Sequence, residues 1–471
     1  MHPYICTMES PVLLWFRQDL RLADNPALHA AAGRPLLAVY VLDDEAAGAW
    51  AHGGASRWWL HHTLAALDAA LRARGIALHL ARGPATRIIP ELATRIGAAE
   101  VHAGRLLEPW ARARDKAIHE ALDGRLKLHT SATLHEPHVI RTQQGKPYSV
   151  YTPFARALFA RGEPAPPLPA PERLHGPDLP GLPLDALELL PQGQPAWWRA
   201  FPADWTPGEA GAQARLARFM AHALRGYADG RNLPAEERTA RLSPHLRFGE
   251  LSPRQVWHAA RSAGAEGEDV FLKEILWREF SYHLLWHRAE MPDVPLDGRF
   301  AAFPWEPDER LLRAWKAGRT GYPIVDAGMR QLWRTGWMHN RVRMIAASLL
   351  VKHLLQPWQA GAACFWDRLL DADLASNSAS WQWVAGCGAD AAPYFRVFNP
   401  TLQGERFDPK GDYVRRWVPE LARVPERYIH KPWDAPGGLP AGYPAPIVAP
   451  ERGRQRALAA YATLRAGADA A

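Results

Sequence analysis

Short apolar runs alternate with longer helical patterns over the first 135 residues. Between the runs lie segments with helical periodicity, such as Ser56–Arg74 and Pro84–Ile96. Strands that alternate with helices of this length predict βαβ units on a parallel sheet. No GxGxxG follows the first run, so the standard dinucleotide fingerprint is absent. The predicted strands are Val12–Phe16, Leu36–Leu42, Ile76–Leu80, Val101–Ala103 and Leu126–His129.

Proline then interrupts regular structure, with 12 prolines between residues 164 and 207. This density excludes regular helix and central strand and predicts a connector that wraps over the surface. From about residue 208 the pattern is helical, most clearly over Gly211–Tyr227, Asp269–His287 and Trp337–Leu355. Ser243-Pro244 and Ser252-Pro253 each predict a helix start with serine as the N-cap. We therefore expect a Rossmann-like α/β domain (11–135), a connector (136–207) and an all-α domain (208–471).

Composition excludes several protein classes. The only cysteines among the 471 residues are Cys6, Cys364 and Cys387, so zinc sites built from Cys pairs and disulfide frameworks are excluded. The low count is typical of a reducing compartment, and we expect a cytoplasmic protein. No leader sequence and no membrane-spanning stretch is expected from the hydrophobic pattern. Met8 is a second candidate start, because structured sequence begins only at Pro11.

Net charge and tryptophan content bear on possible partners and functions. The net charge of +7 allows a polyanionic partner without requiring one. The 21 tryptophans indicate either a large helical core or a use in base stacking or electron transfer. No HExxH occurs, which excludes a zincin-type protease, and we expect no metal.

Three groups of residues are candidates for chemistry. Helical spacing places Glu274, Trp277 and Arg278 on one face, where a carboxylate and an aromatic plane suit a nucleobase, although an exposed Glu beside a core Trp has the same pattern. Asn340 and Arg341 suit a base edge and a phosphate, or simply a solvated first helical turn.

The third group is the segment that contains Asp371, Asp373 and Asn377. Its paired carboxylates suit Mg²⁺, hydrogen bonds to a ribose or a ring N–H, or acid–base catalysis. They are equally typical of solvated loop aspartates. The sequence pattern alone leaves these alternatives open.

Longer strings carry a family resemblance. The sequence is similar to the photolyase/cryptochrome flavoproteins, and most similar to class I-like cyclobutane pyrimidine dimer (CPD) photolyases, from about residue 11 to about 440. The matching strings are LLWFRQDLRLADNPAL (13–28), TARLSPHLRFGELSPRQVW (239–257), WREF (277–280), TGYPIVDAGMRQLWRTGWMHNR (320–341), LLDADLASNSASWQW (369–383) and PYFRVFNPTLQGERFDP (393–409).

The resemblance implies that the all-α domain binds FAD. Ala240 departs from the family, which commonly has Ser there. Asn377 stands where the family places the residue that faces flavin N5. Because Asn cannot protonate the flavin, it favours a reduced, anionic FAD and a photolyase over a plant-type cryptochrome. The residues implied to bind FAD are Tyr227, Thr239, Ala240, Arg241, Leu242, Ser243, Phe271, Arg278, Arg343, Asp371, Ala372, Asp373 and Asn377.

The resemblance also implies repair of CPDs in UV-damaged DNA, by electron transfer from photoexcited reduced FAD to the flipped-out dimer. Enzymes of the (6-4) type have His at both positions 340 and 344, which are Asn and Met here. The implied lesion pocket is Glu274, Trp277, Asn340, Met344 and Trp383. The implied DNA contacts are Arg231, Glu274, Trp277, Asn340, Arg341 and Gln403, and the implied electron-transfer chain is Trp381, Trp358 and Trp305.

Three alternatives remain at this point: a cryptochrome-like blue-light sensor, a (6-4) photolyase and a DNA-binding protein that only keeps the fold. A second, antenna chromophore is also implied. Trp110-Ala111 departs from the folate-binding pattern, while Glu108–Trp110, Arg57 and Arg247 resemble deazaflavin- or flavin-binding members. We therefore expect a deazaflavin or flavin rather than methenyltetrahydrofolate, and a monomeric protein.

Overall fold

A computed structural model describes residues 10–190, 196–391 and 395–469. Met8 and Cys6 lie outside these residues. The N-terminal part contains a parallel five-stranded sheet in the order β3-β2-β1-β4-β5. In the register of this sheet, Leu14 of β1 lies beside Ala38 of β2 and His102 of β4. The strands are β1 (Val12–Phe16), β2 (Leu36–Leu42), β3 (Leu78–Arg82), β4 (Glu100–Gly104) and β5 (Leu126–His129).

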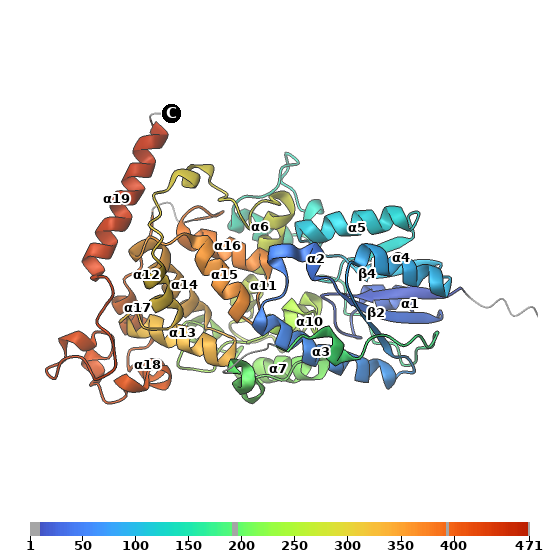
Figure 1. The fold of residues 1–471 in the computed structure, drawn as a ribbon, viewed down its shortest axis with the longest axis horizontal. Coiled ribbons are helices and arrows are strands. Elements are labelled where there is room, and N and C mark those ends of the chain that lie inside the picture. The colour runs from blue at the N-terminus through green and yellow to red at the C-terminus, as the bar shows by residue number, and fades with distance from the viewer. Residues whose placement is uncertain (1–9, 191–195, 392–394, 470–471) are drawn as a thin grey trace, which may run out of the picture.

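Helices cover both faces of this sheet, which explains why β1 and β2 are buried along their whole length. Helices α1 (Pro26–Ala31) and α3 (Gly54–Arg72) pack on the face that carries Leu14, and α4 (Ala85–Ile96) and α5 (Pro109–Ala121) pack on the face that carries Leu13 (Figure 1). The short helix α2 (Asp44–Ala47) follows β2. The predicted parallel α/β architecture is confirmed.

Two strands have other ends than predicted. Val101–Ala103 was expected as the fourth strand, but β4 runs from Glu100 to Gly104. Ile76–Leu80 was expected as the third strand, but β3 runs from Leu78 to Arg82. The ladder to β2 begins at the Ala38–Leu78 pair, and the side chain of Asp68 accepts a hydrogen bond from Leu78 N at 2.9 Å. Pairing with β2, and not the local apolar run, sets where this strand starts and ends.

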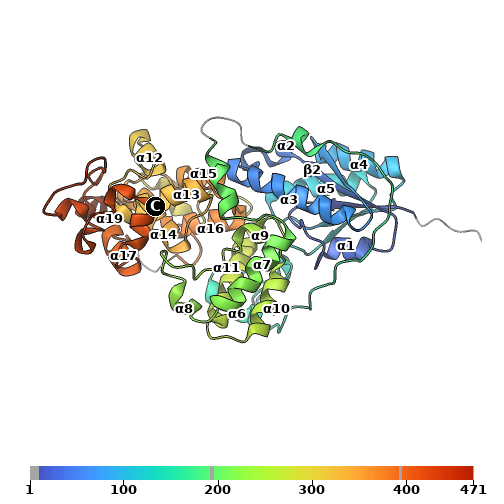
Figure 2. The ribbon, with the colours of Figure 1, turned by 90° about the horizontal axis from the view of Figure 1, so that it is seen from below.

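The connector has a 3-10 turn at Pro137–Val139 and then α6 (Tyr151–Phe159), which packs on the helical part of the molecule (Figure 2). The described residues between 164 and 207 contain only 3-10 turns, Leu184–Leu187 and Trp197–Ala203. This stretch runs beside the edge strand β3 and the first residue of β2, where Leu182 N donates to Leu80 O and Leu36 N donates to His175 O, both at 2.8 Å. It also places Phe201 and Trp205 in a core that α1 and α3 share.

The C-terminal part is helical, as predicted. Figures 1 and 2 show it beside the sheet domain, with the last helix standing at the far end. Its helices are α7 (Glu209–His222), α8 (Tyr227–Gly230), α9 (Ser243–Arg247), α10 (Pro253–Ala263), α11 (Glu268–His287), α12 (Glu309–Lys316), α13 (Pro323–Thr335), α14 (Asn340–Ser348), α15 (Trp358–Arg368), α16 (Leu374–Ala385), α17 (Pro400–Phe407), α18 (Asp412–Trp417) and α19 (Pro450–Asp469).

Two predicted helices are divided. Gly211–Tyr227 forms α7 and, after a break, the start of α8. The break falls at Gly226, which has φ +75°. Trp337–Leu355 forms α14 followed by a π-helical turn, Leu349–His353, with Trp337 outside the helix. No helix in the described ranges is long and apolar enough to span a membrane.

The two predicted serine caps differ. Ser252 caps α10 in a full capping box with Gln255. Ser243 was expected as a cap, but it is the first residue of α9 and Leu242 holds the cap position without a side-chain hydrogen bond. Leu242 has helical φ and ψ, so the helical path begins before Ser243.

Candidate active site

A cavity of about 540 Å³ lies among α8, α9, α11, α14 and α16. Every residue that was expected to bind the cofactor lines this cavity, from Tyr227 to Asn377. The five residues of the expected lesion pocket line it too: Glu274, Trp277, Asn340, Met344 and Trp383. The fold therefore brings two sets of candidates, far apart in the sequence, to one space.

One wall of the cavity is α11, where Glu274, Trp277 and Arg278 lie on one face. The ring of Trp277 stacks on Tyr151 of α6, with centroids 3.6 Å apart and planes 6° apart. Glu274 Oε1 accepts a hydrogen bond from Arg231 Nη1 at 2.5 Å. These contacts fix the position of an aromatic plane and a carboxylate, the pair that suits a nucleobase.

The first turn of α14 forms the mouth of the cavity. His339 caps this helix, its Nδ1 accepting from Arg341 N at 3.2 Å, and Asn340 is exposed. Arg341 does not line the cavity: its Nη2 donates to Asn232 Oδ1 at 2.6 Å and its guanidinium lies 4.5 Å from the Phe407 ring centroid. Arg341 is thus held beside the mouth.

The two aspartates of the 371–373 segment make different hydrogen bonds. Asp373 caps α16, accepting from Ser376 N at 2.7 Å, and also accepts from the Tyr282 hydroxyl. Asp371 Oδ2 accepts from Arg343 at 2.8 Å. Asp371 Oδ1 is buried and has no protein partner. The buried Oδ1 leaves an acceptor for an N–H or O–H donor of a ligand in the cavity.

A magnesium site was one alternative for these aspartates. Within the described residues no group of three or more His, Cys, Asp or Glu side chains could hold a metal ion. Both carboxylates already have protein partners, so their arrangement fits hydrogen bonding to an organic ligand better than metal ligation.

The loop that contains Arg241 forms another side of the cavity. Arg241 has φ +49°, an uncommon backbone conformation for a non-glycine residue. Its guanidinium lies 4.6 Å from the Trp205 ring centroid and 4.8 Å from that of Trp337. Arg241 Nε is buried without a partner. Together with the Thr239 and Ser243 side chains, this cation lines the cavity where an anionic ligand group would be stabilised.

Known proteins identify this arrangement. Residues 271–463 match the model described as "FAD binding domain of DNA photolyase", and residues 12–172 match the DNA photolyase model. The deoxyribodipyrimidine photo-lyase of Agrobacterium fabrum is 50% identical over 97% of this chain and 98% of its own length. The chain belongs to the DNA photolyase family.

Two further relatives bear on its place in that family. A crystal structure described as a bacterial class III photolyase from Agrobacterium tumefaciens superposes with a TM-score of 0.93 at 49% identity, over 97% of this chain and 98% of that one. Cryptochrome-1 of Arabidopsis thaliana is 36% identical over 94% of this chain and 69% of its own length. The expected similarity to class I enzymes is not confirmed by these relatives and stays a prediction.

The residues of the photolyase cavity fit FAD. Asp371 Oδ1 offers a buried acceptor, Arg241 a partly buried cation with a buried Nε, and Tyr227, Phe271 and Phe280 an apolar wall. The cavity is large enough for a flat, multi-ring ligand, in keeping with pockets of several hundred Å³. Asn377 lines it as well, with Nδ2 donating to Ala362 O at 3.1 Å.

Of the expected electron-transfer chain, only Trp381 reaches the cavity. Trp358 is buried at the start of α15, and Trp305 packs on Phe303 with centroids 4.4 Å apart. The rings that neighbour Trp381 are Phe365 at 5.0 Å and Trp315 at 6.2 Å. Trp315 was not singled out from the sequence.

The remaining candidates lie outside or at the edge of the cavity. Gln403 is on α17, and Arg231, at the end of α8, lines the cavity. Among the antenna candidates, Arg57 pairs with Asp44 at 2.8 Å and Arg247 donates to Ala372 O at 2.6 Å. Arg247 also lines the cavity. It therefore belongs in part to the cofactor site and not solely to a seam between domains.

Sequence analysis missed several lining residues. Three of them lie inside the matched family strings but were not predicted to line the cavity: Phe280, Trp337 and Met338. Tyr151 does not line the cavity but supports Trp277, and no sequence pattern linked these two residues, which are 126 positions apart. Aromatic residues inside the matched strings were the one usable indication.

Proposed function

We propose that this protein repairs cyclobutane pyrimidine dimers in UV-damaged DNA, in light, with reduced FAD. The observation that supports the proposal is the single cavity that joins the candidate FAD residues to Glu274, Trp277, Asn340, Met344 and Trp383. The activity named for the Agrobacterium fabrum relative agrees with it.

The residues that line the cavity would hold reduced FAD, which would supply photoinduced electron transfer: one electron to the dimer and back, without net oxidation. The chain's own residues bind and orient the lesion. Trp277, held by Tyr151, and Trp383 offer planes for a flipped-out dimer, whose damaged stacking makes extraction inexpensive. Glu274 accepts hydrogen bonds from the base edge, and the ion pair with Arg231 holds that carboxylate in place.

The (6-4) photolyase alternative is less well supported. Its chemistry needs acid groups at the mouth of the cavity, but Asn340 and Met344 carry no titratable proton. Ring splitting of a CPD needs an electron and no general acid. These two side chains therefore favour the CPD as substrate.

The light-sensor alternative shares the cofactor but needs no lesion pocket. Asn377 in place of an acid leaves the flavin without a nearby proton donor at that position, which favours an anionic reduced cofactor.

We further propose that Trp381, Trp358 and Trp305 re-reduce the cofactor. We also propose that Arg341 and Gln403 bind the DNA strand, and that the protein acts as a monomer. A deazaflavin or flavin antenna is proposed on the resemblance of Glu108–Trp110, Arg57 and Arg247 to members that bind one.

The deciding experiment uses oligothymidine that contains CPDs, with the reduced holoprotein. Recovery of thymine absorbance under blue light and none in the dark would support the proposal. If FAD is bound and photoreducible but absorbance does not recover, CPD repair is excluded. The (6-4) substrate, tested in the same way, then separates a different repair enzyme from a sensor.

A further inference from the structure

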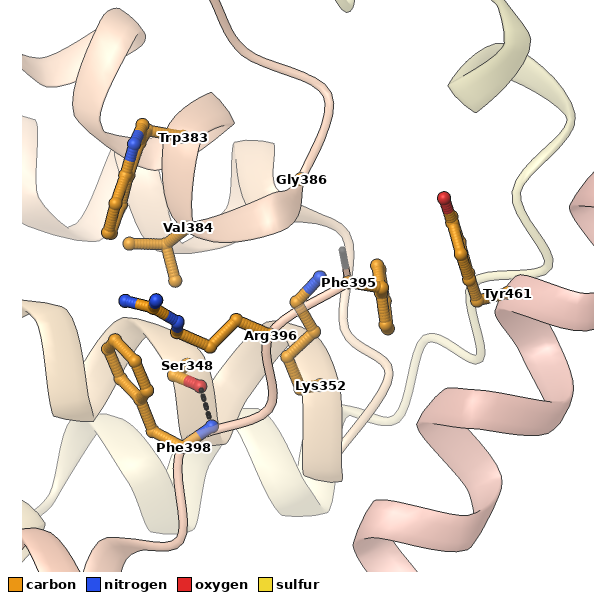
Figure 3. A pocket seen from close by; sticks show the side chains of 9 residues that line it. All are labelled: Ser348, Lys352, Trp383, Val384, Gly386, Phe395, Arg396, Phe398 and Tyr461. Atoms are coloured by element: carbon orange, nitrogen blue, oxygen red, sulfur yellow. Dashed lines mark hydrogen bonds between the residues drawn. The ribbon is translucent and has the colours of Figure 1, made fainter. Parts of the chain in front are cut away.

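A second, small cavity of about 40 Å³ lies directly behind Trp383 (Figure 3). Trp383 and Val384 form one side of it, and Arg396 and Phe398 the other. Trp383 lines both cavities. The residues that pack around the small cavity therefore also determine where one wall of the large cavity lies.

Lys352 forms the floor of this small cavity and is 1% exposed. It lies on the π-helical turn Leu349–His353, a local irregularity that is frequent at functional sites. Within the described part of the chain, no carboxylate pairs with Lys352. Burial holds the pKa of its amine well below the ordinary value, opposed only by the Cys387 thiol. A buried amine without a counter-ion costs stability, so a structural purpose alone would be better served by Met.

Two contacts account for the position of the amine. Lys352 Nζ donates to Ala385 O at 2.6 Å, and Ala385 is the last residue of α16, where carbonyls lack helical partners. Gly386 follows with φ +95°, a backbone conformation that favours glycine. Trp383 is two residues before the anchored carbonyl.

The second contact reaches the C-terminal helix. Lys352 Nζ lies 3.0 Å from the Phe395 ring centroid, and Phe395 stacks on Tyr461 of α19 at 4.5 Å and 8°. Figure 3 shows the amine pointing between Gly386 and the Phe395 ring, with Tyr461 beyond it. Helix α19 is itself held by Arg456, which donates to Glu306 at 2.5 Å.

We propose that Lys352 is a positioning residue of the lesion pocket: it ties the C-terminal end of α16, and with it Trp383, to Phe395 and to helix α19. The role assigned to Trp383 rests on the proposed function. Lys352 does not line the large cavity. It acts by limiting the movement of one of the two aromatic planes that hold the dimer.

The test compares Lys352→Met with Lys116→Met, the same change at a side chain that is 78% exposed on α5. Lys352→Met should keep its FAD and its melting temperature, because Met fills the same space without a buried charge. Its Kd and KM for dimer-containing DNA should rise about tenfold, equivalent to ~1.4 kcal/mol, with kcat nearly unchanged. Lys116→Met should change none of these.

Two further measurements keep the proposal falsifiable. Amide exchange at residues 383–388, followed without substrate, should be faster in Lys352→Met, and unchanged exchange would overturn the tie to α16 even if the protein repairs no dimer. Tyr461→Ala should reproduce part of the KM effect and Tyr461→Phe should not, because only Phe keeps the stacked ring. Loss of FAD or of melting temperature in step with the KM change would show a merely structural role and overturn the proposal.

Discussion

The Trp277 ring lies flat on the Tyr151 ring, 3.6 Å between centroids, and so joins the connector to the central wall of the cavity. We predict that Tyr151→Ala weakens binding of dimer-containing DNA about fivefold, since an aromatic pair contributes ~1 kcal/mol beyond its buried area. Tyr151→Phe keeps the stack and should bind normally. Titration of both variants with a labelled dimer oligonucleotide measures the two affinities. If Tyr151→Ala binds as tightly as the unaltered protein, Tyr151 does not support lesion binding.

Glu274 is expected to act on the lesion and not on the cofactor. Glu274→Gln replaces a charged acceptor by a neutral one, which should slow repair about tenfold, in the range of a charge-assisted hydrogen bond of ~1.5–3 kcal/mol. FAD content should stay at the level of the unaltered protein. Single-turnover repair in light measures the first quantity and flavin absorbance the second. Glu290→Gln, a change in an exposed pair with Arg288, is the control.

Arg341 should contact phosphate. Arg341→Ala is expected to weaken binding to damaged and undamaged DNA alike, and to lower the slope of log affinity against log salt by about 1. Arg72→Ala, at a guanidinium that is 62% exposed on α3, should leave the slope unchanged. A loss that is confined to damaged DNA, with the slope intact, would contradict a phosphate contact.

Asp371 and Arg343 form a pair in which the Asp371 side chain is 3% exposed and that of Arg343 23%. Asp371→Asn removes the carboxylate that pairs with Arg343. It also replaces the carboxylate Oδ1, the acceptor that faces the cofactor, by a neutral amide group. We expect loss of bound FAD and destabilisation of the protein by about 2 kcal/mol, below the ~3–5 kcal/mol of a fully buried pair because Arg343 is partly solvated. Flavin absorbance per protein and urea unfolding measure the two effects. Glu420→Gln, which breaks a partly buried ion pair with Arg330 outside the cavity, should keep FAD.

Glu279 predicts a dependence of stability on pH. Burial raises the pKa of Glu279 to about 7, from an ordinary value of 4.5, against the attraction of Arg278. Because the folded carboxyl holds its proton more tightly than the unfolded one, its contribution is complete below pH 4.5 and is lost as pH rises through 7. The loss amounts to about 3 kcal/mol.

Glu279→Gln mimics the protonated side chain and should remove most of this dependence. Leu134 N, which donates to Glu279 Oε2 at 2.9 Å, keeps an acceptor in this variant. Melting temperatures at pH 5 and pH 8 test the prediction, with Glu91→Gln, an exposed change on α4, as the control. A variant whose melting temperature falls with pH as steeply as that of the unaltered protein would contradict it.

The sequence predicted what local patterns and matched strings encode. Strand β1 and helix α4 follow from apolar runs and periodicity, and the candidates around Asp371 from the family strings. Three features had no such source. The start of β3 depends on pairing with β2, the break before Tyr227 on Gly226, and the partner of Trp277 on how the connector folds back. Long-range pairing of this kind leaves no local pattern.

The core that includes Phe201 and Trp205 also contains Trp337 and Leu370 of the helical part and Trp58 of α3. The sheet domain therefore completes its own interior with side chains from the other half of the chain. Cutting the chain within the connector would expose this shared interior on both fragments, so neither half is an independent folding unit. Heat or denaturant should unfold the two halves together in one cooperative transition, and a domain exchange between relatives would have to carry the connector with it.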